Sequence, residues 1–313
     1  MEKINNREQP LVSIIVITYN SSKYVIETLE SAKNQTYQNI ELIISDDASK
    51  DETVKICSQW LIQNKERFVK TELITVSENT GVPANCNRGL MVANGKWIKL
   101  IAGDDILLRN CIKENLLFIG QNSCYMVYSN MLFFNNEREW EERNYLLEYF
   151  NLIDSKRKLR LYARYSFFMN APSWFIKRNI ISEIGGFDEE FKLLEDQPFL
   201  LKFLNLNYKV KFLDVFTIKY RVNEGSIVQT QSLLFIDYLE LCFKKIRVKK
   251  FKKFNPKDFI YKYDQLLRYK MSRRPNSIGL KILHRGSPAK YFITFLIKFS
   301  NKKFPFWIKR LIS

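Results

Sequence analysis

Two pairs of adjacent aspartates are the residues of this chain whose types and spacing are best suited to chemistry. Asp104 and Asp105 follow the apolar run WIKLIAG, and Asp46 and Asp47 follow the apolar run IELIIS. Adjacent carboxylates repel each other, and an ionised carboxylate beside a low-dielectric core costs several kcal/mol unless it is neutralised. A divalent cation that carries a polyphosphate would neutralise them, and a solvent-exposed turn would also tolerate them.

Apolar, β-branched runs alternate with helical patterns over the first hundred residues. This alternation predicts parallel βαβ units, which form a doubly wound sheet whose ligands bind at the carboxyl ends of the strands. Ser49 and Glu52 have the spacing of a capping box, which predicts the start of the second helix. The expected strands span residues 11–18, 40–45, 71–76 and 97–102, and the expected helices span about 22–35, 50–62 and 83–93.

The two acidic pairs follow equivalent strands of this expected sheet. Residues just past the strands of an open parallel sheet converge on one crevice, so the pairs are expected to face the same ligand. The sequence contains neither a G-x-G-x-x-G motif nor a Walker A lysine motif, so no glycine loop is expected to hold phosphates. A metal on Asp105 is the remaining economical way to bind a diphosphate, because hard cations prefer carboxylate oxygens.

Three blocks of the sequence resemble, in order and separation, the family 2 inverting glycosyltransferases of the GT-A fold. The blocks begin VSIIVITYNSSKYV, NTGVPANCNRGLMV and EIGGFDEEFKLLED, and the resemblance covers about residues 10–230. It implies a mostly parallel, doubly wound α/β sheet and a nucleotide-diphosphate sugar donor, which we expect to be a UDP-sugar. It also implies a lipid-linked saccharide acceptor in the synthesis of a bacterial surface polysaccharide such as capsule or O-antigen.

The resemblance implies a role for each residue that matches a family motif. The end of the first strand lies against the nucleotide, and the acidic pair after the second strand binds the base. The pair after the fourth strand binds ribose and Mn²⁺ or Mg²⁺, and the last block supplies the general base, Asp196, with Glu195 beside it. The implied donor-binding residues are Thr18, Tyr19, Asn20, Asp46, Asp47, Asn87, Arg88 and Asp104, and the implied metal ligand is Asp105.

The composition also favours a carboxylate as the base. His284 is the only histidine, and the five cysteines show no CxxC spacing, which fits reduced thiols better than a zinc site or a disulfide framework. The attacking hydroxyl has a pKa far above neutral, so a carboxylate must accept its proton as the bond forms. One base, one metal and one in-line attack give inversion, whereas retaining glycosidases need a second carboxylate as nucleophile.

Two positions depart from the family pattern. Cys86 stands where many members have an arginine that contacts the donor, and Arg88 is the candidate substitute. Asn223 stands where many members have a histidine, and it offers a metal an amide oxygen at most.

Each acidic pair also has an explanation without chemistry. Asp46–Asp47 can form a turn and cap, Asp104–Asp105 can begin a helix, and Glu195–Asp196 can be the acidic first turn of a helix that ends near Asn205. Trp174 is expected to pack in the core rather than to bind the acceptor, because most aromatic residues are packing residues.

The net charge of +17 is concentrated in the C-terminal part of the chain. Residues 244–313 contain 21 Lys and Arg but 2 Asp and Glu, a net of +19, which leaves −2 for residues 1–243. Basic residues interleaved with aromatic and aliphatic ones are typical of segments at an anionic membrane surface, and they also suit single-stranded nucleic acid. We therefore expect a GT-A domain at 1–235 and a basic, mainly helical, membrane-associating extension at 236–313.

The N-terminal segment MEKINNREQP has no apolar stretch, so no signal peptide is expected, and the longest apolar run is too short to span a membrane. These features predict a cytoplasmic protein that is peripheral on the inner face of the cell membrane. A second hypothesis, from another class, is a non-catalytic nucleotide- or sugar-binding protein whose basic tail binds nucleic acid. The presence of both Asp105 and Asp196 favours the enzyme, for which nucleic acid is not an expected partner.

Overall fold

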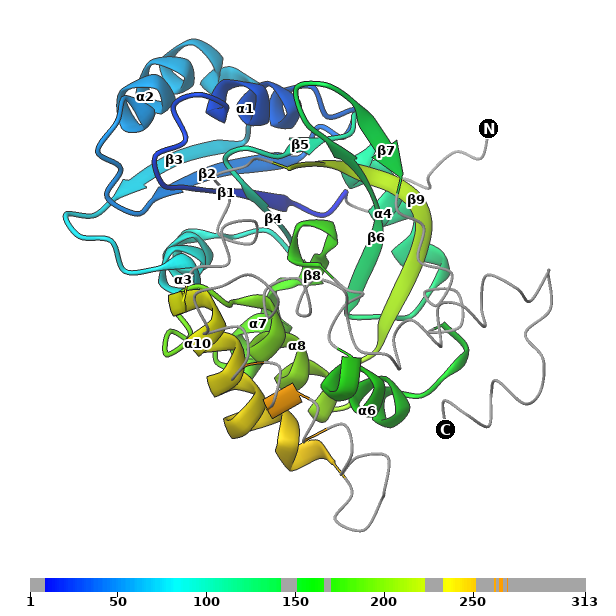
Figure 1. Ribbon diagram of the computed structural model, residues 1–313. Coiled ribbons are helices and arrows are strands. Elements are labelled where there is room, and N and C mark those ends of the chain that lie inside the picture. Colours follow the sequence, from blue (N-terminus) through cyan, green and yellow to red (C-terminus); the bar gives the residue numbers. More distant parts are fainter. Residues whose placement is uncertain are drawn as a thin grey trace.

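The fold is a mixed α/β arrangement around one nine-stranded sheet, seen in the computed structural model of the chain (Figure 1). The structure describes residues 9–141, 151–165, 170–222 and 233–251, together with residues 262, 265, 266 and 269. The strand order is β3-β2-β1-β4-β8-β6-β9-β5, and β7 pairs with β6. The strands are β1 (Val12–Thr18), β2 (Ile40–Asp46), β3 (Lys70–Thr75), β4 (Trp97–Ala102), β5 (Ile106–Leu107), β6 (Met126–Phe134), β7 (Glu139–Glu141), β8 (Phe175–Lys177) and β9 (Val210–Arg221).

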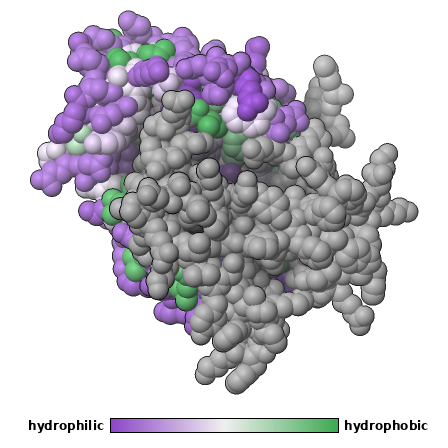
Figure 2. All heavy atoms as spheres, viewed as in Figure 1, coloured by the Kyte–Doolittle hydropathy of each residue, from purple (hydrophilic) through white to green (hydrophobic). Residues whose placement is uncertain are grey.

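The first half of the sheet is the parallel, doubly wound part that the sequence predicts. β3, β2, β1 and β4 pair in parallel. The side chains of β1 and β2 are buried on both faces of the sheet, as expected for continuous apolar runs. Helices α1 (Val25–Lys33) and α2 (Thr53–Asn64) cover one face, and α3 (Val82–Val92) covers the other. The outer surface around α1 and α2 is mainly hydrophilic (Figure 2), as expected for helices that bury one side.

The start of α2 differs from the predicted capping box. The carboxylate of Asp51 accepts hydrogen bonds from the Thr53 N–H (3.0 Å) and the Thr53 hydroxyl (2.5 Å), which caps the helix from two residues upstream. The Ser49 hydroxyl donates instead to Asp46 Oδ2 (2.5 Å). The capping-box prediction was therefore wrong, because Asp51 caps the helix and Ser49 serves the acidic pair.

The second half of the sheet contains pairings that the sequence analysis did not place. β8 runs antiparallel to both β4 and β6, whereas β6 and β9 pair in parallel with register shifts near Ser129 and Asn130. β9 also pairs antiparallel with β5, so its end returns to the segment that follows β4. This half packs against α4 (Cys111–Gln121), α6 (Ser155–Tyr165), α7 (Arg178–Ile184) and α8 (Asp196–Asn205).

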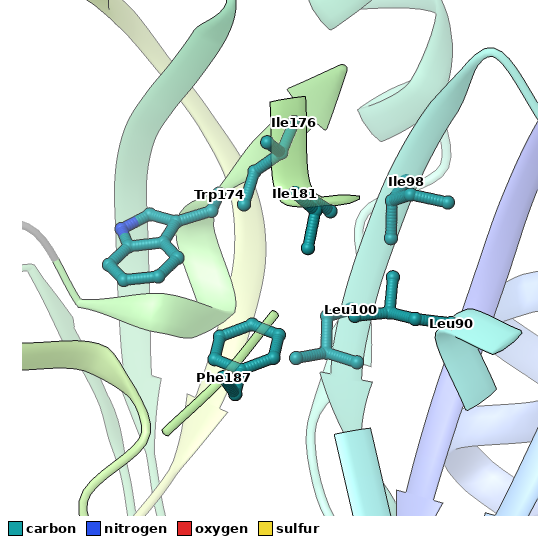
Figure 3. A pocket seen from close by; sticks show the side chains of 7 residues that line it. All are labelled: Leu90, Ile98, Leu100, Trp174, Ile176, Ile181 and Phe187. Atoms are coloured by element: carbon teal, nitrogen blue, oxygen red, sulfur yellow. The ribbon is translucent and has the colours of Figure 1, made fainter. Parts of the chain in front are cut away.

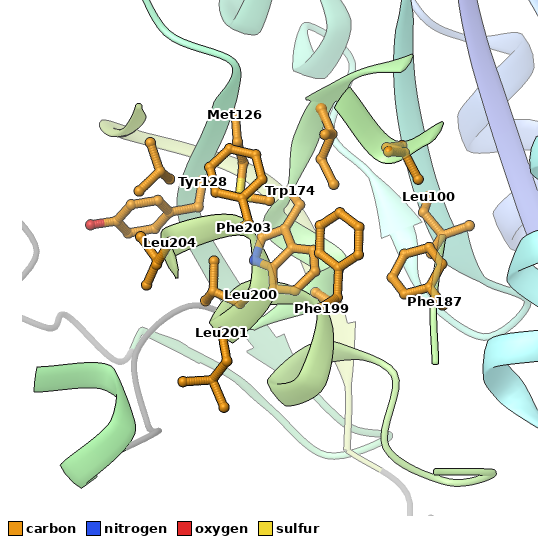
Figure 4. Packing of buried hydrophobic residues seen from close by; sticks show 14 of the residues in the cluster. Leu100, Met126, Tyr128, Trp174, Phe187, Phe199, Leu200, Leu201, Phe203 and Leu204 are labelled. Carbon is orange, nitrogen blue, oxygen red and sulfur yellow. The ribbon is translucent and has the colours of Figure 1, made fainter. Parts of the chain in front are cut away.

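Trp174 packs in the core, as predicted. The side chain is 2% exposed, and its ring centroid lies 5.7 Å from that of Phe199, which itself lies 4.7 Å from that of Phe187 (Figure 4). A small cavity beside it is walled by apolar side chains from α3, β4, β8 and α7 (Figure 3). These walls offer few polar groups, so the cavity is not suited to a charged donor. Its lining residues are Leu90, Ile98, Leu100, Trp174, Ile176, Ile181 and Phe187.

The described part of the basic C-terminal segment packs against the body of the protein. It comprises α10 (Leu233–Cys242), a π-helix (Phe243–Arg247) and a 3₁₀ turn (Val248–Lys250). Cys242 and Phe243 are fully buried, and Arg247 Nε donates to the carbonyl of Ala163 on α6 (2.7 Å). The expected domain boundary near residue 235 falls within α10, and the apolar-basic segment 291–313 lies outside the described residues. Over the described residues, no helix has the length and apolar character needed to cross a membrane.

Candidate active site

The carboxyl ends of the parallel strands lie side by side. Thr18 at the end of β1 pairs with Asp46 at the end of β2, and the Asp47 N–H donates to the Thr18 carbonyl (3.0 Å). On the other side of β1, the Gly103 N–H donates to the Ile17 carbonyl (2.9 Å). A Cβ atom on Gly103 would lie 2.8 Å from Thr18 Cγ2, so a glycine is needed for this close approach. The residues after β2 and β4 therefore flank the same strand end.

Asp46 holds the loop that follows β2. Its carboxylate accepts hydrogen bonds from the hydroxyls of Thr18 (2.8 Å) and Ser49 (2.5 Å) and from the Ser49 N–H (2.8 Å). The Asn20 N–H, from a residue in the left-handed region (φ 51°), donates to the same Ser49 hydroxyl. Tyr19, which lies between Thr18 and Asn20 in the sequence, is 49% exposed, so it can contact a ligand. Asp46 therefore stabilises a turn, as the explanation without chemistry expects. Its contact with the base of a nucleotide stays a prediction.

Asp47 and Arg88 form the charged wall of the crevice on the α3 side. The Asp47 carboxylate accepts from the Thr80 hydroxyl (2.7 Å), the Gly81 N–H (2.8 Å) and Arg88 Nη2 (2.5 Å). Burial would raise the pKa of Asp47, but the hydrogen bonds from Thr80, Arg88 and Gly81 outweigh it, so the pKa is lowered. Cys86, at the family's arginine position, is fully buried, whereas Arg88 reaches the crevice. Arg88 therefore pairs with the first acidic pair, and its role as a substitute for the missing arginine stays a prediction.

Asp105 is a carboxylate whose burial is not matched by its hydrogen bonds. It is 1% exposed; Oδ1 accepts from the Arg221 N–H (2.9 Å), while Oδ2 is buried without a hydrogen-bond partner among the described residues. Burial and then the charge of Asp104 raise the pKa of Asp105 well above its ordinary value. The following helix, α4, begins at Cys111, so neither aspartate is its cap. A cation ligand would satisfy the unpaired oxygen.

A cation at Asp105 would need ligands beyond the described carboxylates. Within the described residues, no group of three or more His, Cys, Asp or Glu side chains lies close enough to hold a metal ion. Mg²⁺ and similar hard cations are commonly held by one or two carboxylates together with substrate phosphates and water. Asp105 fits that pattern, and Asn223, the departure from the family histidine, lies outside the described residues.

Arg221 is the residue of this site that sequence analysis missed. Its Nε donates to the Asp104 carbonyl (2.8 Å), and its Nη2 donates to the Glu27 carboxylate on α1 (2.7 Å). Its guanidinium lies over two rings, 4.1 Å from the centroid of Tyr24 and 4.4 Å from that of Phe134. Together with its N–H bond to Asp105, these contacts fix the second acidic pair. The sequence signal was its place two residues before Asn223, the position at which many family members have a histidine.

Lys99 is a second buried cation that the sequence analysis missed. It is fully buried within β4, and its Nζ donates to the carbonyls of Pro172 (2.5 Å) and Trp174 (3.2 Å). Burial lowers the pKa of Lys99, while the charge of Asp105 opposes that change. These hydrogen bonds hold the segment before β8 against β4, the strand that the second acidic pair follows.

Glu195 and Asp196 stand at the start of α8, and both are half-buried. Burial raises the pKa of Asp196 to about 6. Burial, followed by the charge of Asp196, raises the pKa of Glu195 to about 8. Asp196 does occupy the first turn of a helix, as the alternative explanation expects. A carboxylate with a pKa near 6 is also ionised at neutral pH and able to accept a proton.

Asn87 fastens the loop that leads to α8. Its Nδ2 donates to the Phe187 carbonyl (2.9 Å) and to the Glu189 carboxylate (2.8 Å), and its Oδ1 accepts from the Phe187 N–H (2.9 Å). Gly186 has φ 72°, and a Cβ atom there would lie 2.7 Å from Asn87 Oδ1. Asn87 therefore positions the segment that carries Glu195 and Asp196, and its contact with the donor stays a prediction.

Tyr220 connects the two halves of the site. Its pKa is raised first by burial and then by the charges of Asp105, Asp104, Glu195 and Asp196. The charges of both acidic pairs therefore act on this tyrosine.

A comparison with protein families identifies the chain. The model described as "Glycosyl transferase family 2" matches residues 13–185, which include both pairs of aspartates. The chain belongs to glycosyl transferase family 2. It is therefore a glycosyltransferase, and the membership favours the enzyme over the non-catalytic hypothesis.

Two curated relatives agree with this assignment. The chain is 27% identical over 231 residues to "Glycosyltransferase GlyG" of Streptococcus pneumoniae serotype 4, covering 71% of this chain and 74% of that one. It is 35% identical over 120 residues to "UDP-Glc:alpha-D-GlcNAc-diphosphoundecaprenol beta-1,3-glucosyltransferase WfaP" of Escherichia coli. That match covers 38% of this chain and 45% of the relative.

Solved structures confirm the GT-A fold. S. aureus TarS 1-349 in complex with UDP superposes with a TM-score of 0.60 at 20% identity, covering 91% of this chain and 78% of that one. The mannosyltransferase PcManGT from Pyrobaculum calidifontis, in complex with GDP-Man and Mn²⁺, superposes with a TM-score of 0.57 at 16% identity, covering 91% and 81%. At these identities the likeness establishes the fold of the glycosyltransferase, and the site rests on its own residues.

Replacing Glu195 with Gln should increase the free energy of unfolding by on the order of 2 kcal/mol at pH 8 and by much less at pH 5. The folded chain holds the Glu195 proton up to a pKa of about 8, whereas the unfolded chain loses it near pH 4.5. The carboxylate therefore destabilises the fold increasingly as the pH rises through this window. Urea unfolding at the two pH values measures the effect. The control is Glu52→Gln, at a side chain that is 65% exposed. An equal increase in the free energy of unfolding of Glu195→Gln at both pH values would contradict the raised pKa of Glu195.

Proposed function

We propose that this glycosyltransferase moves a sugar from a UDP-sugar to a lipid-linked saccharide acceptor, with inversion, during synthesis of a bacterial surface polysaccharide. Two observations support the proposal: a buried carboxylate oxygen of Asp105 that has no hydrogen-bond partner among the described residues, and a half-buried carboxylate of raised pKa on Asp196. The first suits a metal diphosphate, and the second suits a proton acceptor.

The nucleoside is proposed to bind between the ends of β1 and β2. Asp47, ionised by its hydrogen bonds, can accept the N–H of a uracil, and Arg88 beside it can donate to the base or a phosphate. Asp104 is proposed to accept the ribose hydroxyls, and the exposed ring of Tyr19 is proposed to contact the nucleotide. The UDP of the TarS complex and the UDP-Glc in the name of the WfaP relative support a uridine donor.

Mn²⁺ or Mg²⁺ is proposed as the cofactor, held by Asp105. Its Oδ2 atom is a buried carboxylate oxygen without a hydrogen-bond partner in the part of the chain that the structure describes, and carboxylate oxygens are the ligands that a hard cation prefers. A bound cation would offset the negative charge that develops on the leaving diphosphate. Arg221 holds the other oxygen of Asp105 through its N–H, so the carboxylate stays oriented whether or not the cation is present. The Mn²⁺ in the PcManGT complex supports this choice.

Asp196 is proposed to be the general base. The acceptor hydroxyl attacks the anomeric carbon of the donor sugar while its proton passes to Asp196, and the bond to the diphosphate breaks. With a pKa of about 6, the carboxylate is ionised at pH 7 yet retains basicity, which suits a base that works near neutral pH. The pKa of Glu195 is raised further, by burial and by the charge of Asp196, so Glu195 is the less suitable of the two. A single displacement inverts the anomeric configuration.

The basic C-terminal extension is proposed to hold the enzyme on the inner face of the cell membrane. Its charge of +19 over residues 244–313 would attract anionic lipids, at about 1 kcal/mol for each basic residue near the surface. The diphosphoundecaprenol in the name of the WfaP relative supports a lipid-linked acceptor at that surface. Residues 1–235 are proposed to form the catalytic domain and residues 236–313 the extension.

Asp105→Asn should abolish the Mn²⁺-dependent part of UDP binding. The amide keeps the shape and can still accept from the Arg221 N–H, but it lacks the charge that holds a cation. Thermal shift with UDP, measured with Mn²⁺ and with EDTA, should show a Mn²⁺-dependent stabilisation in the wild type and none in the variant. Asp214→Asn, on the exposed side chain bonded to Asn130, is the matched control. A full Mn²⁺-dependent shift in Asp105→Asn would contradict the metal assignment.

Asp196→Asn should lower kcat by roughly 10²–10⁴ while leaving the affinity for UDP unchanged, because the amide cannot take a proton. In the wild type, kcat/KM should fall as the pH drops below about 6, where Asp196 becomes protonated. Release of UDP in the presence of donor and acceptor measures both quantities. Glu195→Gln is the matched control and should retain most of the turnover. Near-normal turnover in Asp196→Asn would place the base elsewhere.

Deletion of residues 291–313 should reduce sedimentation with anionic phospholipid vesicles and leave UDP binding intact, because the crevice lies before residue 222. Binding of the full chain should weaken as salt rises, since its electrostatic part is screened. Neutral phosphatidylcholine vesicles are the control. Equal sedimentation of the two chains, or salt-sensitive binding of the full chain to RNA but not to vesicles, would refute the membrane proposal.

A further inference from the structure

Three aromatic residues form a row across neighbouring strands beside the crevice. Trp140 of β7 pairs directly with Phe133 of β6, which pairs directly with Tyr220 of β9. The Phe133 and Trp140 ring centroids lie 6.0 Å apart with planes inclined by 22°, and the Phe133 and Tyr220 centroids lie 5.6 Å apart at 68°. The three residues are only half-buried, so the row keeps part of its surface open.

The inner end of the row lies next to the second acidic pair. Tyr220 adjoins Arg221, whose N–H donates to Asp105 Oδ1 (2.9 Å). Successive side chains of a strand point to opposite faces, and Arg221 points to the face that carries Glu27 and Tyr24, so Tyr220 points to the other face. From there the row runs through Phe133 to Trp140 on β7, the strand that pairs with β6 outside the main strand order (Figure 1).

We propose that Trp140, Phe133 and Tyr220 form a platform for a pyranose unit of the acceptor. One face of a pyranose presents C–H groups, which lose contact with water when they cover an aromatic ring, while its hydroxyls stay at the rim. A saccharide that reaches Tyr220 lies next to Asp105, which is proposed to hold the metal diphosphate of the donor. Cross-strand packing alone accounts for the pairing, but it does not require a row that stays half open and ends beside the second acidic pair.

The outer end of the row has a polar group suited to the same ligand. The Arg138 guanidinium lies 5.0 Å from the centroid of the Trp140 ring, and Arg138 itself is exposed. Guanidinium groups donate to hydroxyls and phosphates. An aromatic floor with a few polar groups at its rim is typical of small-molecule sites. The platform is the acceptor site of the proposed glycosyl transfer, and this inference rests on that proposed function.

Saturation-transfer NMR with methyl glycosides of glucose, galactose, mannose and N-acetylglucosamine, recorded with UDP and Mn²⁺ present, tests the platform. At least one glycoside should receive saturation at its ring C–H protons from the wild-type chain. Trp140→Ala should weaken that binding about tenfold, and Phe133→Leu should weaken it as well. Tyr125→Ala is the matched control, since Tyr125 is a 36% exposed aromatic residue just before β6 begins, and it should leave binding unchanged.

Thermal shift by UDP and Mn²⁺ separates the platform from the proposed function. Trp140→Ala should keep the wild-type shift, which also shows that the variant is folded. If UDP stabilises the wild type but no glycoside binds it, or if Trp140→Ala and Phe133→Leu bind glycosides as the wild type does, the platform is wrong. Glycoside binding that depends on Trp140 in a chain that UDP does not stabilise would contradict the proposed donor and support the platform.

Discussion

Negative charge gathered at the carboxyl ends of the strands is the constraint on which the site depends. Asp105 is buried just after β4, one of its oxygens has no hydrogen-bond partner among the described residues, and burial together with Asp104 opposes its ionisation. Two buried cations offset part of this cost, since the charges of Arg221 and Lys99 both lower the pKa of Asp105. Neither of them satisfies Oδ2, which is the reason for proposing a cation there.

The same constraint explains how the two halves of the sheet are joined. The parallel half presents Asp47, Asp104 and Asp105 at one edge, and apolar side chains cover both faces of β1 and β2. The mixed half brings the end of β9 back to that edge, where Arg221 fixes the second acidic pair.

The sequence predicts the parallel half of the fold well because each strand and helix there carries its own local pattern. It does not predict β8, which has three residues and therefore no periodicity, nor the curved pairing of β6 with β9. The acidic pairs are visible in sequence because strand ends converge in a parallel sheet. The roles of Arg221 and Lys99 are not visible, because they depend on contacts such as Arg221–Glu27, which lie 194 residues apart. The capping prediction failed because Asp51, rather than Ser49, accepts the hydrogen bonds at the start of α2.

The most direct test of the account is a crystal structure of the full chain with UDP and Mn²⁺, with anomalous diffraction recorded near the manganese absorption edge. The account predicts an anomalous peak about 2.1 Å from Asp105 Oδ2 that also contacts the diphosphate, with the uracil against Asp47. UDP bound at this crevice with no cation on Asp105, or manganese bound at another place in the chain, would contradict it.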